Sequence, residues 1–194
     1  MQTLSIIAGI FKNHKIELVE DARTRYTPAK VKNAVFSILE SRKDINGSMF
    51  LDLCAGSGQM GFEALSRGAS LIHFVDISSH SIKTLKNNVQ KLMVCDQVRL
   101  FKKDVIRFLS SPPQTYDLIF IDPPFTEILF NKIVRKLLET DSILKDNGRI
   151  IVESEKGFSV DHSDLYELED AYLYSSIKIE IFKRKEKIDE HSRC

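Results

Sequence analysis

Short apolar runs alternate with segments of helical spacing along most of this chain. From residue 49 onward, each run rich in β-branched and aromatic residues precedes a segment in which apolar residues recur every three or four positions. The predicted strands are Met49–Leu53, Leu71–Asp76, Val98–Phe101, Tyr116–Asp122 and Gly148–Glu153. The predicted helices are Gly58–Arg67, Ser79–Lys91, Val105–Ser110 and Ile128–Thr140. This alternation predicts an α/β fold whose mostly parallel sheet is covered by helices on both faces.

The C-terminal part departs from the alternation. The runs Leu165–Tyr174 and Ile177–Arg184 both have strand character, and two serines separate them. They predict an antiparallel hairpin, which fits the edge of an otherwise parallel sheet. We expect a single domain over residues 1–194, with residues 1–47 as an N-terminal extension that contributes to nucleic-acid binding.

The N-terminal extension has its own pattern. Residues 4–19 predict a small hairpin. An amphipathic helix follows, with Thr27 as its N-cap and Pro28 in its first turn. Lys30 and Lys32 are expected to face outward from this helix.

The composition limits the class of protein. With 194 residues, 43% of them hydrophobic and 28% charged, the chain is long enough for one core several strands wide. Its apolar runs are too short to span a bilayer, and its first residues lack the basic flank of a signal peptide, so we expect a cytoplasmic protein. Cys54, Cys95 and Cys194 form neither a paired framework nor a CxxC ligand set, and we expect reduced thiols and no metal.

Positive charge gathers in the N-terminal segment, although the formal net charge is only +1. A local basic cluster is typical of contact with nucleic-acid phosphates, whereas a solvated helix face is the alternative explanation. The candidate nucleic-acid-binding residues are Lys12, Arg23, Arg25, Lys30 and Lys32.

A glycine loop follows the first predicted strand of the sheet. Residues 52–61, DLCAGSGQMG, place a G-x-G-x-x-G between a strand and a helix, where glycines let the backbone approach a ligand closely. Asp76 ends the next strand, where a carboxylate can hold both hydroxyls of a ribose. Asp52 would repel a pyrophosphate but could interact with an ammonium group, so S-adenosylmethionine fits this loop better than NAD.

The third predicted strand ends near another carboxylate. Asp104 is placed to accept a hydrogen bond from an adenine amine, and Val105 could pack on the adenine ring. Asp104 could instead be the N-cap of the short helix that follows. Both interpretations stay open on the sequence alone.

Residues 117–125, DLIFIDPPF, bring a carboxylate, two prolines and an aromatic ring to the end of a predicted strand. Asp122 and the carbonyl of Pro123 accept hydrogen bonds, and Phe125 offers a face on which a base can stack. A strand that ends in a proline turn is the alternative. The first and fourth strands of a doubly wound sheet flank its switch point, so this motif is expected to face the nucleoside site. We therefore predict methylation of an amine, with Asp122, Pro123, Pro124 and Phe125 as the candidate catalytic residues.

These segments resemble one family, the RsmD-type methyltransferases, which modify the exocyclic N2 amine of a guanine in small-subunit (16S) ribosomal RNA. The resemblance rests on IIAG at 6–9, RYT at 25–27, KVK at 30–32, FSIL at 36–39, the loop at 52–58, EALSRGA at 63–69, DPPF at 122–125 and VESE at 152–155. It implies a seven-stranded, Rossmann-like methyltransferase fold that binds S-adenosylmethionine, and catalysis at residues 122–125. The candidate cofactor-binding residues are Asp52, Ala55, Gly56, Ser57, Gly58, Asp76, Ile77, Asp104 and Val105.

The chain departs from the family pattern in three places. It has Tyr26 where the family usually has proline, Asn13 in place of a Lys-Gly-Arg glycine, and Ser175 where a glycine follows tyrosine. These departures bear on the contacts with RNA and hardly on the cofactor site.

Four other functions remain as alternatives. A DNA adenine-N6 methyltransferase uses a similar acidic motif but usually needs a region that reads its target, whereas this chain has almost nothing beyond the catalytic domain. That favours a substrate already shaped by RNA structure or ribosomal proteins, as in a small-subunit particle. We also expect the protein to be a monomer. A protein-glutamine methyltransferase commonly has Asn-Pro-Pro-Tyr at the motif. An NAD-dependent oxidoreductase leaves Asp52 and Asp122 unexplained, and a non-catalytic RNA-binding module would not need Asp122.

Overall fold

The computed structural model describes residues 2–19, 26–42, 44–123, 126–158, 160 and 163–186. Its strands are β1 (Thr3–Ser5), β2 (Lys15–Glu17), β3 (Met49–Leu53), β4 (Leu71–Asp76), β5 (Val98–Lys102), β6 (Tyr116–Ile121), β7 (Leu144–Glu155), β8 (Tyr166–Tyr174) and β9 (Ile177–Arg184). Its α-helices are α1 (Ala29–Ser41), α2 (Gln59–Ser66), α3 (Ser79–Leu92), α4 (Val105–Leu109) and α5 (Glu127–Leu138). The predicted elements are all present; the ends of β3, β4 and β9 match the predictions, and the ends of the others differ by a few residues.

Seven of the strands form one sheet in the order β5-β4-β3-β6-β7-β9-β8. The strands from β5 to β7 in that order pair in parallel, whereas β9 runs antiparallel to both of its neighbours. The predicted fold class is confirmed, and the closing hairpin lies at the edge with β8 outermost. Because β3 and β6 are direct neighbours, the chain order reverses between them and creates the expected switch point.

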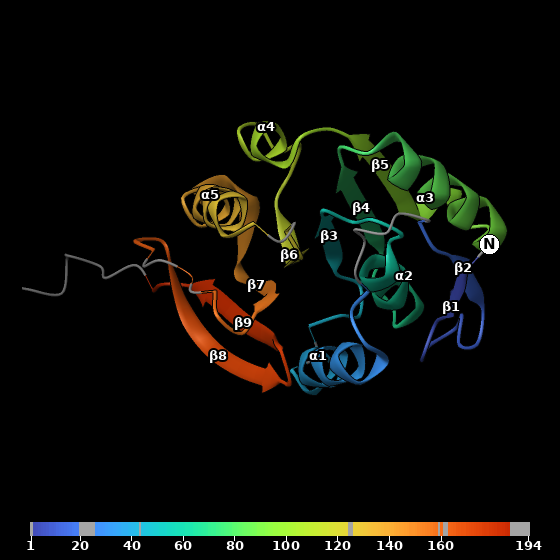
Figure 1. Ribbon diagram of the computed structural model, residues 1–194, viewed down its shortest axis with the longest axis horizontal. Coiled ribbons are helices and arrows are strands. Elements are labelled where there is room, and N and C mark those ends of the chain that lie inside the picture. The colour runs from blue at the N-terminus through green and yellow to red at the C-terminus, as the bar shows by residue number, and fades with distance from the viewer. Residues whose placement is uncertain are drawn as a thin grey trace, which may run out of the picture.

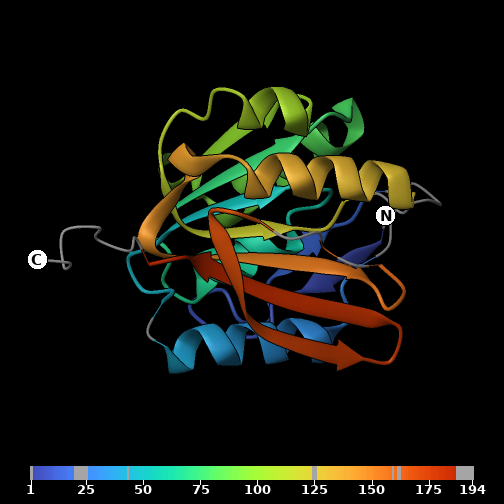
Figure 2. The ribbon, with the colours of Figure 1, turned by 90° about the vertical axis from the view of Figure 1, so that its left-hand side faces the viewer.

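Helices cover both faces of this sheet. Figure 2 shows α5 above the sheet and α1 below it. Phe36 of α1, Phe62 of α2 and Leu85 of α3 belong to one apolar core, whereas Phe108 of α4 and Ile133 of α5 belong to the other. The central strands send alternate side chains into the two cores, as pleated strands do. Within the described residues, none of the helices is long and apolar enough to cross a membrane.

The predicted N-terminal hairpin forms a separate two-stranded sheet of β1 and β2. It lies beside α2 and α3 (Figure 1). The backbone N–H groups of Ile7 and Ala8 donate to the carboxylate of Glu63 on α2, at 2.9 and 3.0 Å. On the α3 side, Asn88 accepts from the N–H of Glu17 at 2.7 Å and donates to its carbonyl at 3.0 Å. The extension is therefore attached to the helix that follows the glycine loop and to the next helix along the chain.

The prediction that Thr27 caps the N-terminal helix is wrong. Pro28 occupies the N-cap position of α1, and no side chain caps this helix. The hydroxyl of Thr27 donates instead to Oε2 of Glu153 on β7, at 2.8 Å. The hydroxyl thus donates to a buried carboxylate, and the side chain does not accept from a helix N–H group as an N-cap would.

The prediction that Lys32 faces outward is also wrong. Lys32 is 1% exposed, and its Nζ lies 3.5 Å from Oε2 of the fully buried Glu63. Lys32 precedes Phe36 by one turn of α1, so both lie on the stripe that faces the core. The carboxylate of Glu63 provides a partner for the ammonium group inside this stripe.

Candidate functional site

A cavity of about 440 Å³ lies at the carboxyl ends of the parallel strands. It occupies the switch point between β3 and β6, where open α/β sheets bind their ligands. Residues that follow β3, β4, β5 and β6 line it, together with residues of α5 and of the N-terminal segment. Every predicted cofactor-binding residue except Gly58 is among the lining residues.

The three glycines of the loop have different roles. Gly56 has a φ of +54°, and a Cβ added there would meet no described atom within 4 Å, so its open side can face a ligand. Gly58 has a φ of +78°, and a Cβ there would lie 2.5 Å from Cδ2 of Leu85. A Cβ at Gly61 would lie 2.3 Å from Cε1 of Phe74. Gly58 therefore allows the start of α2 to approach α3 closely, Gly61 allows α2 to pack closely on the sheet, and Gly56 borders the cavity.

Asp76 joins the glycine loop to the end of β4. Its Oδ2 accepts from the N–H of Gly56 at 2.8 Å, and its Oδ1 accepts from the N–H of Ser78 at 2.8 Å. Each carboxylate oxygen retains a second lone pair, which is what the paired hydroxyls of a ribose require. The prediction for Asp76 therefore agrees with its position in the cavity wall.

Asp52 is a buried carboxylate beneath the loop. It is 2% exposed, and its Oδ2 accepts from the N–H of Gly61 at 2.9 Å. Burial raises the pKa of Asp52 well above its ordinary value, the hydrogen bond from Gly61 opposes this shift, and the charge of Asp76 adds to it. A cationic group in the cavity would stabilise the ionised form of Asp52.

The wall beside β5 combines a carboxylate with apolar surface. Oδ1 of Asp104 accepts from the N–H of Arg107 at 3.0 Å, so the N-cap interpretation is confirmed. Asp104 also lines the cavity, where its other oxygen can accept from a ligand. Val105 and Ile77 line the same region, and Ile77 is 67% exposed although it is apolar. An exposed apolar side chain at a cavity wall suits the face of a flat ring.

Cys54 marks the point at which the carboxylates converge. Burial raises the pKa of its thiol well above the ordinary value, and the charges of Asp76, Asp122, Asp52 and Asp104 raise it further. Cys54 was not among the predicted site residues, because it belongs to no cysteine motif. Its surroundings are strongly negative, and this favours a positively charged ligand.

The predicted catalytic motif lies partly within the described residues. Asp122 and Pro123 follow β6 directly and line the cavity. Pro124 and Phe125 lie outside the described residues. Asp122 thus shares a cavity with Asp76 and Gly56, as the switch-point argument predicts.

The N-terminal segment forms a wall that the sequence did not predict. Val19, Tyr26 and Thr27 all line the cavity. The hydroxyl of Tyr26 donates to the carbonyl of Val19 at 2.6 Å, and the N–H of Val19 donates to Oγ of Ser57 at 2.7 Å. These contacts connect the wall to the glycine loop. Because they depend on folding of remote segments, no local pattern indicated them.

The candidate nucleic-acid-binding residues differ in accessibility. Lys12 and Lys30 are exposed, so their ammonium groups are available to a partner. Lys32 is buried against Glu63 and cannot contact a phosphate without unfolding, which corrects its assignment. Arg23 and Arg25 lie outside the described residues.

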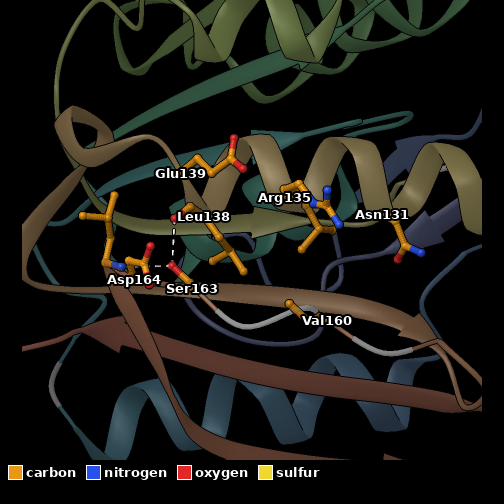
Figure 3. Close-up of a pocket in the computed structure, with 9 residues that line it drawn as sticks. Asn131, Arg135, Leu138, Glu139, Val160, Ser163 and Asp164 are labelled. Atoms are coloured by element: carbon orange, nitrogen blue, oxygen red, sulfur yellow. Dashed lines mark hydrogen bonds between the residues drawn. The ribbon is translucent and has the colours of Figure 1, made fainter.

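A second hollow, of about 660 Å³, lies between α5 and residues 160 and 163–165 (Figure 3). Ser163 donates there from Oγ to the carbonyl of Leu138 at 2.9 Å. None of the predicted site residues lines this hollow. Among the residues that the structure describes, no group of three or more His, Cys, Asp or Glu side chains could hold a metal ion.

Comparisons with known proteins find similar chains among the methyltransferases. The model of a family described as "Conserved hypothetical protein 95" matches residues 4–182. The chain is 35% identical to the "Ribosomal RNA small subunit methyltransferase D" of Haemophilus influenzae over 78% of each chain. It is 32% identical to a "Putative rRNA methyltransferase" of Bacillus subtilis over 79% of this chain and 83% of the relative. Its fold is similar to that of a putative methyltransferase from Escherichia coli, with a TM-score of 0.84, 23% identity, and coverage of 96% of this chain and 100% of the other. The resemblance noted in the sequence is thereby confirmed.

Proposed function

Because the chain belongs to the family described as conserved hypothetical protein 95, with relatives named as ribosomal RNA methyltransferases, we propose that it methylates the exocyclic N2 amine of a guanine in small-subunit (16S) ribosomal RNA. The observation that carries this proposal is a single cavity that holds the glycine loop, Asp76 and Asp122. The finer parts of the proposal are the 16S target, action as a monomer in the cytoplasm, and independence of metal.

The cavity fits S-adenosylmethionine better than NAD. Its four carboxylates would repel a pyrophosphate, whereas they favour the ammonium and sulfonium charges of S-adenosylmethionine. Asp76 would hold the ribose hydroxyls and Asp104 the adenine amine, with Ile77 and Val105 against the ring. Asp52 would interact with the methionine part, directly or through water. When bound, S-adenosylmethionine supplies a methyl group attached to a positively charged sulfur.

Asp122 and Pro123 would bind and orient the target amine. The lone pair of an aromatic amine is delocalised into its ring, which makes the nitrogen a poor nucleophile. If the carboxylate of Asp122 and the carbonyl of Pro123 each accept one N–H, the nitrogen can become pyramidal with its lone pair directed at the methyl carbon. Such positioning can lower the barrier by several kcal/mol, and the carboxylate also stabilises the positive charge that develops on nitrogen. The proton can leave later, so Asp122 need not remove it first.

A structured RNA is favoured over duplex DNA as the substrate. The described residues outside the catalytic core are the β1–β2 sheet and α1, and both pack against the core. Lys12 and Lys30 remain exposed on this extension for phosphate contacts. A guanine must leave its stack to reach the cavity, and stacking on Phe125 would offset part of that cost.

One experiment tests the substrate and the reaction together. The protein is incubated with labelled S-adenosylmethionine and, separately, naked ribosomal RNA, small-subunit particles and duplex DNA. Nuclease digestion and mass spectrometry then locate the label. We expect N2-methylguanine from the small-subunit RNA, whereas N6-methyladenine from DNA would support the main rival.

A further inference from the structure

Glu153 is a buried acid that the proposed reaction does not use. It lies on β7 and is 6% exposed. Burial raises its pKa to about 7, and the hydrogen bond from Thr27 opposes this shift. Burying a carboxyl group costs free energy, so the contacts of Glu153 should show why it is buried there.

The sheet places Glu153 next to Asp122. Ile121 of β6 pairs in parallel with Val152 of β7, so the following residues, Asp122 and Glu153, lie side by side where β6 ends. Both follow residues that alternate between the two cores, and Phe120 and Ile151 belong to the same core. The alternation therefore directs Asp122 and Glu153 to the same face of the sheet.

Glu153 reaches the cavity through one contact. It does not line the cavity itself, whereas Thr27 lines it together with Asp122 and Pro123. The 2.8 Å hydrogen bond from Oγ1 of Thr27 to Oε2 of Glu153 joins residues that are 126 positions apart in the chain. The neighbouring Tyr26 is bound to Val19, which in turn is bound to the glycine loop at Ser57. The bond to Glu153 holds the other end of this wall, on the side of the proposed catalytic carboxylate.

We propose that Glu153 is a positioning residue for the target nucleotide, because through Thr27 it fixes the N-terminal wall of the cavity beside Asp122. The proposal rests on the function proposed above and adds the hydrogen bond that holds the cavity wall in place for the base. The cofactor half of the cavity is held separately, by the bonds of Asp76 and Asp52 to the backbone. Loss of the bond between Thr27 and Glu153 should therefore weaken substrate binding and spare cofactor binding.

Two pairs of variants distinguish the effect of losing the hydrogen bond from the effect of changing the side chains. Thr27→Val and Glu153→Met remove it, whereas Thr27→Ser keeps the donor and Glu153→Gln keeps an acceptor. We expect Thr27→Val and Glu153→Met each to raise the KM for small-subunit particles by about tenfold, the effect of one lost buried hydrogen bond. Thr27→Ser and Glu153→Gln should stay within about threefold of wild type. The double variant of Thr27→Val with Glu153→Met should be no worse than either single variant, because both remove one interaction.

Matched controls lie outside the cavity. Thr140→Val removes a buried hydroxyl that donates to Lys136 on α5, at 2.7 Å. Glu180→Gln changes a buried acid on β9 that pairs with Val152, on the opposite face of the sheet from Glu153. Both control variants should keep the wild-type KM. All variants are compared at temperatures below their melting points, with the dissociation constant of S-adenosylhomocysteine measured in parallel.

The outcomes are distinct. Folded Thr27→Val and Glu153→Met with a wild-type KM would overturn the positioning role, and so would an equal loss of cofactor affinity. A Glu153→Gln variant as impaired as Glu153→Met would also contradict it. If the wild-type protein transfers no methyl group to any RNA, the proposed function fails, and this inference fails with it. A normal wild type with unaffected variants refutes the inference alone.

Discussion

Nζ of Lys32 lies 3.5 Å from Oε2 of Glu63, and both side chains are buried. Burial lowers the pKa of Lys32, and the charge of Glu63 opposes this shift. Glu63 also accepts hydrogen bonds from Ile7, Ala8 and Arg67. The carboxylate of Glu63 thus joins the segment after β1, helix α1 and the end of α2, and Lys32 contributes to the fold rather than to a charged surface.

The contrast between Lys30 and Lys32 gives the first prediction. Lys32→Ala should destabilise the protein by about 2–4 kcal/mol, because it leaves a cavity and removes a buried partner of Glu63. Lys30→Ala should change stability by less than about 0.5 kcal/mol, because Lys30 is exposed. If Lys30 contacts a phosphate, its loss should lower the slope of log affinity against log salt by about one. Denaturant titrations and binding isotherms for small-subunit particles at several salt concentrations measure both effects. If folded Lys32→Ala changed the salt slope more than Lys30→Ala does, Lys32 rather than Lys30 would be the phosphate contact.

The second prediction concerns the cofactor. S-adenosylhomocysteine should raise the melting temperature of the wild-type protein, whereas NAD should not. Asp76→Ala should lose most of this shift, because it removes the proposed ribose contact. Asp117→Ala is the matched control, since Asp117 also accepts from a backbone N–H, that of Met49 at 2.8 Å, but lies at the start of β6. Thermal melts with and without ligand check the prediction, and a normal shift in Asp76→Ala would move the ribose contact elsewhere.

The third prediction concerns the reaction itself. Asp122→Ala should lower the single-turnover rate of methyl transfer by about 100-fold or more. Asp122→Asn should retain more activity, because the amide oxygen still accepts one hydrogen bond without the charge. Asp146→Ala, which changes an acid with a 96% exposed side chain, is the control and should be fully active. A rate close to wild type in Asp122→Ala would exclude the proposed role of this carboxylate.

The fourth prediction uses the pH dependence of stability. The pKa of Glu153 rises from 4.5 to about 7 in the folded protein, so the folded state binds a proton that the unfolded state has already released in this range. The stabilisation from this group is complete below pH 4.5, falls as the pH rises, and is lost above about pH 7. The difference corresponds to about 3 kcal/mol. Glu153→Gln cannot ionise, so its stability relative to wild type should increase by that order between pH 4.5 and pH 8. The free energy of unfolding of the two proteins is measured across this pH range. A difference that does not change with pH would contradict a buried, neutral carboxyl at Glu153.

The sequence predicted the elements that depend on local pattern and missed the contacts that depend on remote acids. β3 and β4 match their predicted ranges because each is a compact apolar run between turn residues. The capping prediction for Thr27 failed because Glu153 competes for its hydroxyl. The outward orientation of Lys32 failed because Glu63 offers a buried partner. Neither acid lies near its partner in the chain, so helical periodicity alone could not reveal these pairs.

The candidate site was predicted best where a motif fixes its own position. The glycine loop, Asp76 and Asp122 follow parallel strands, and the topology brings the carboxyl ends of these strands together. Cys54 and Tyr26 escaped prediction because their residue types carry no signal at those positions. Both line the cavity only because of how the loop after β3 and the N-terminal segment fold around it.

The position of β9 between β7 and β8 constrains how the sheet assembles. β8 pairs with β9 and has no other neighbour in the sheet, although β8 precedes β9 in the chain. During synthesis β8 therefore cannot pair within the sheet until β9 has been made. Until then the backbone groups along the edge of β7 are unpaired and can bind other strands. The strands of the parallel half, which carries the cofactor cavity, are synthesised before this step. A chain cut before Ile177 would keep the glycine loop and Asp122 but would leave the edge of β7 unpaired. Such a fragment should aggregate rather than accumulate as a smaller enzyme.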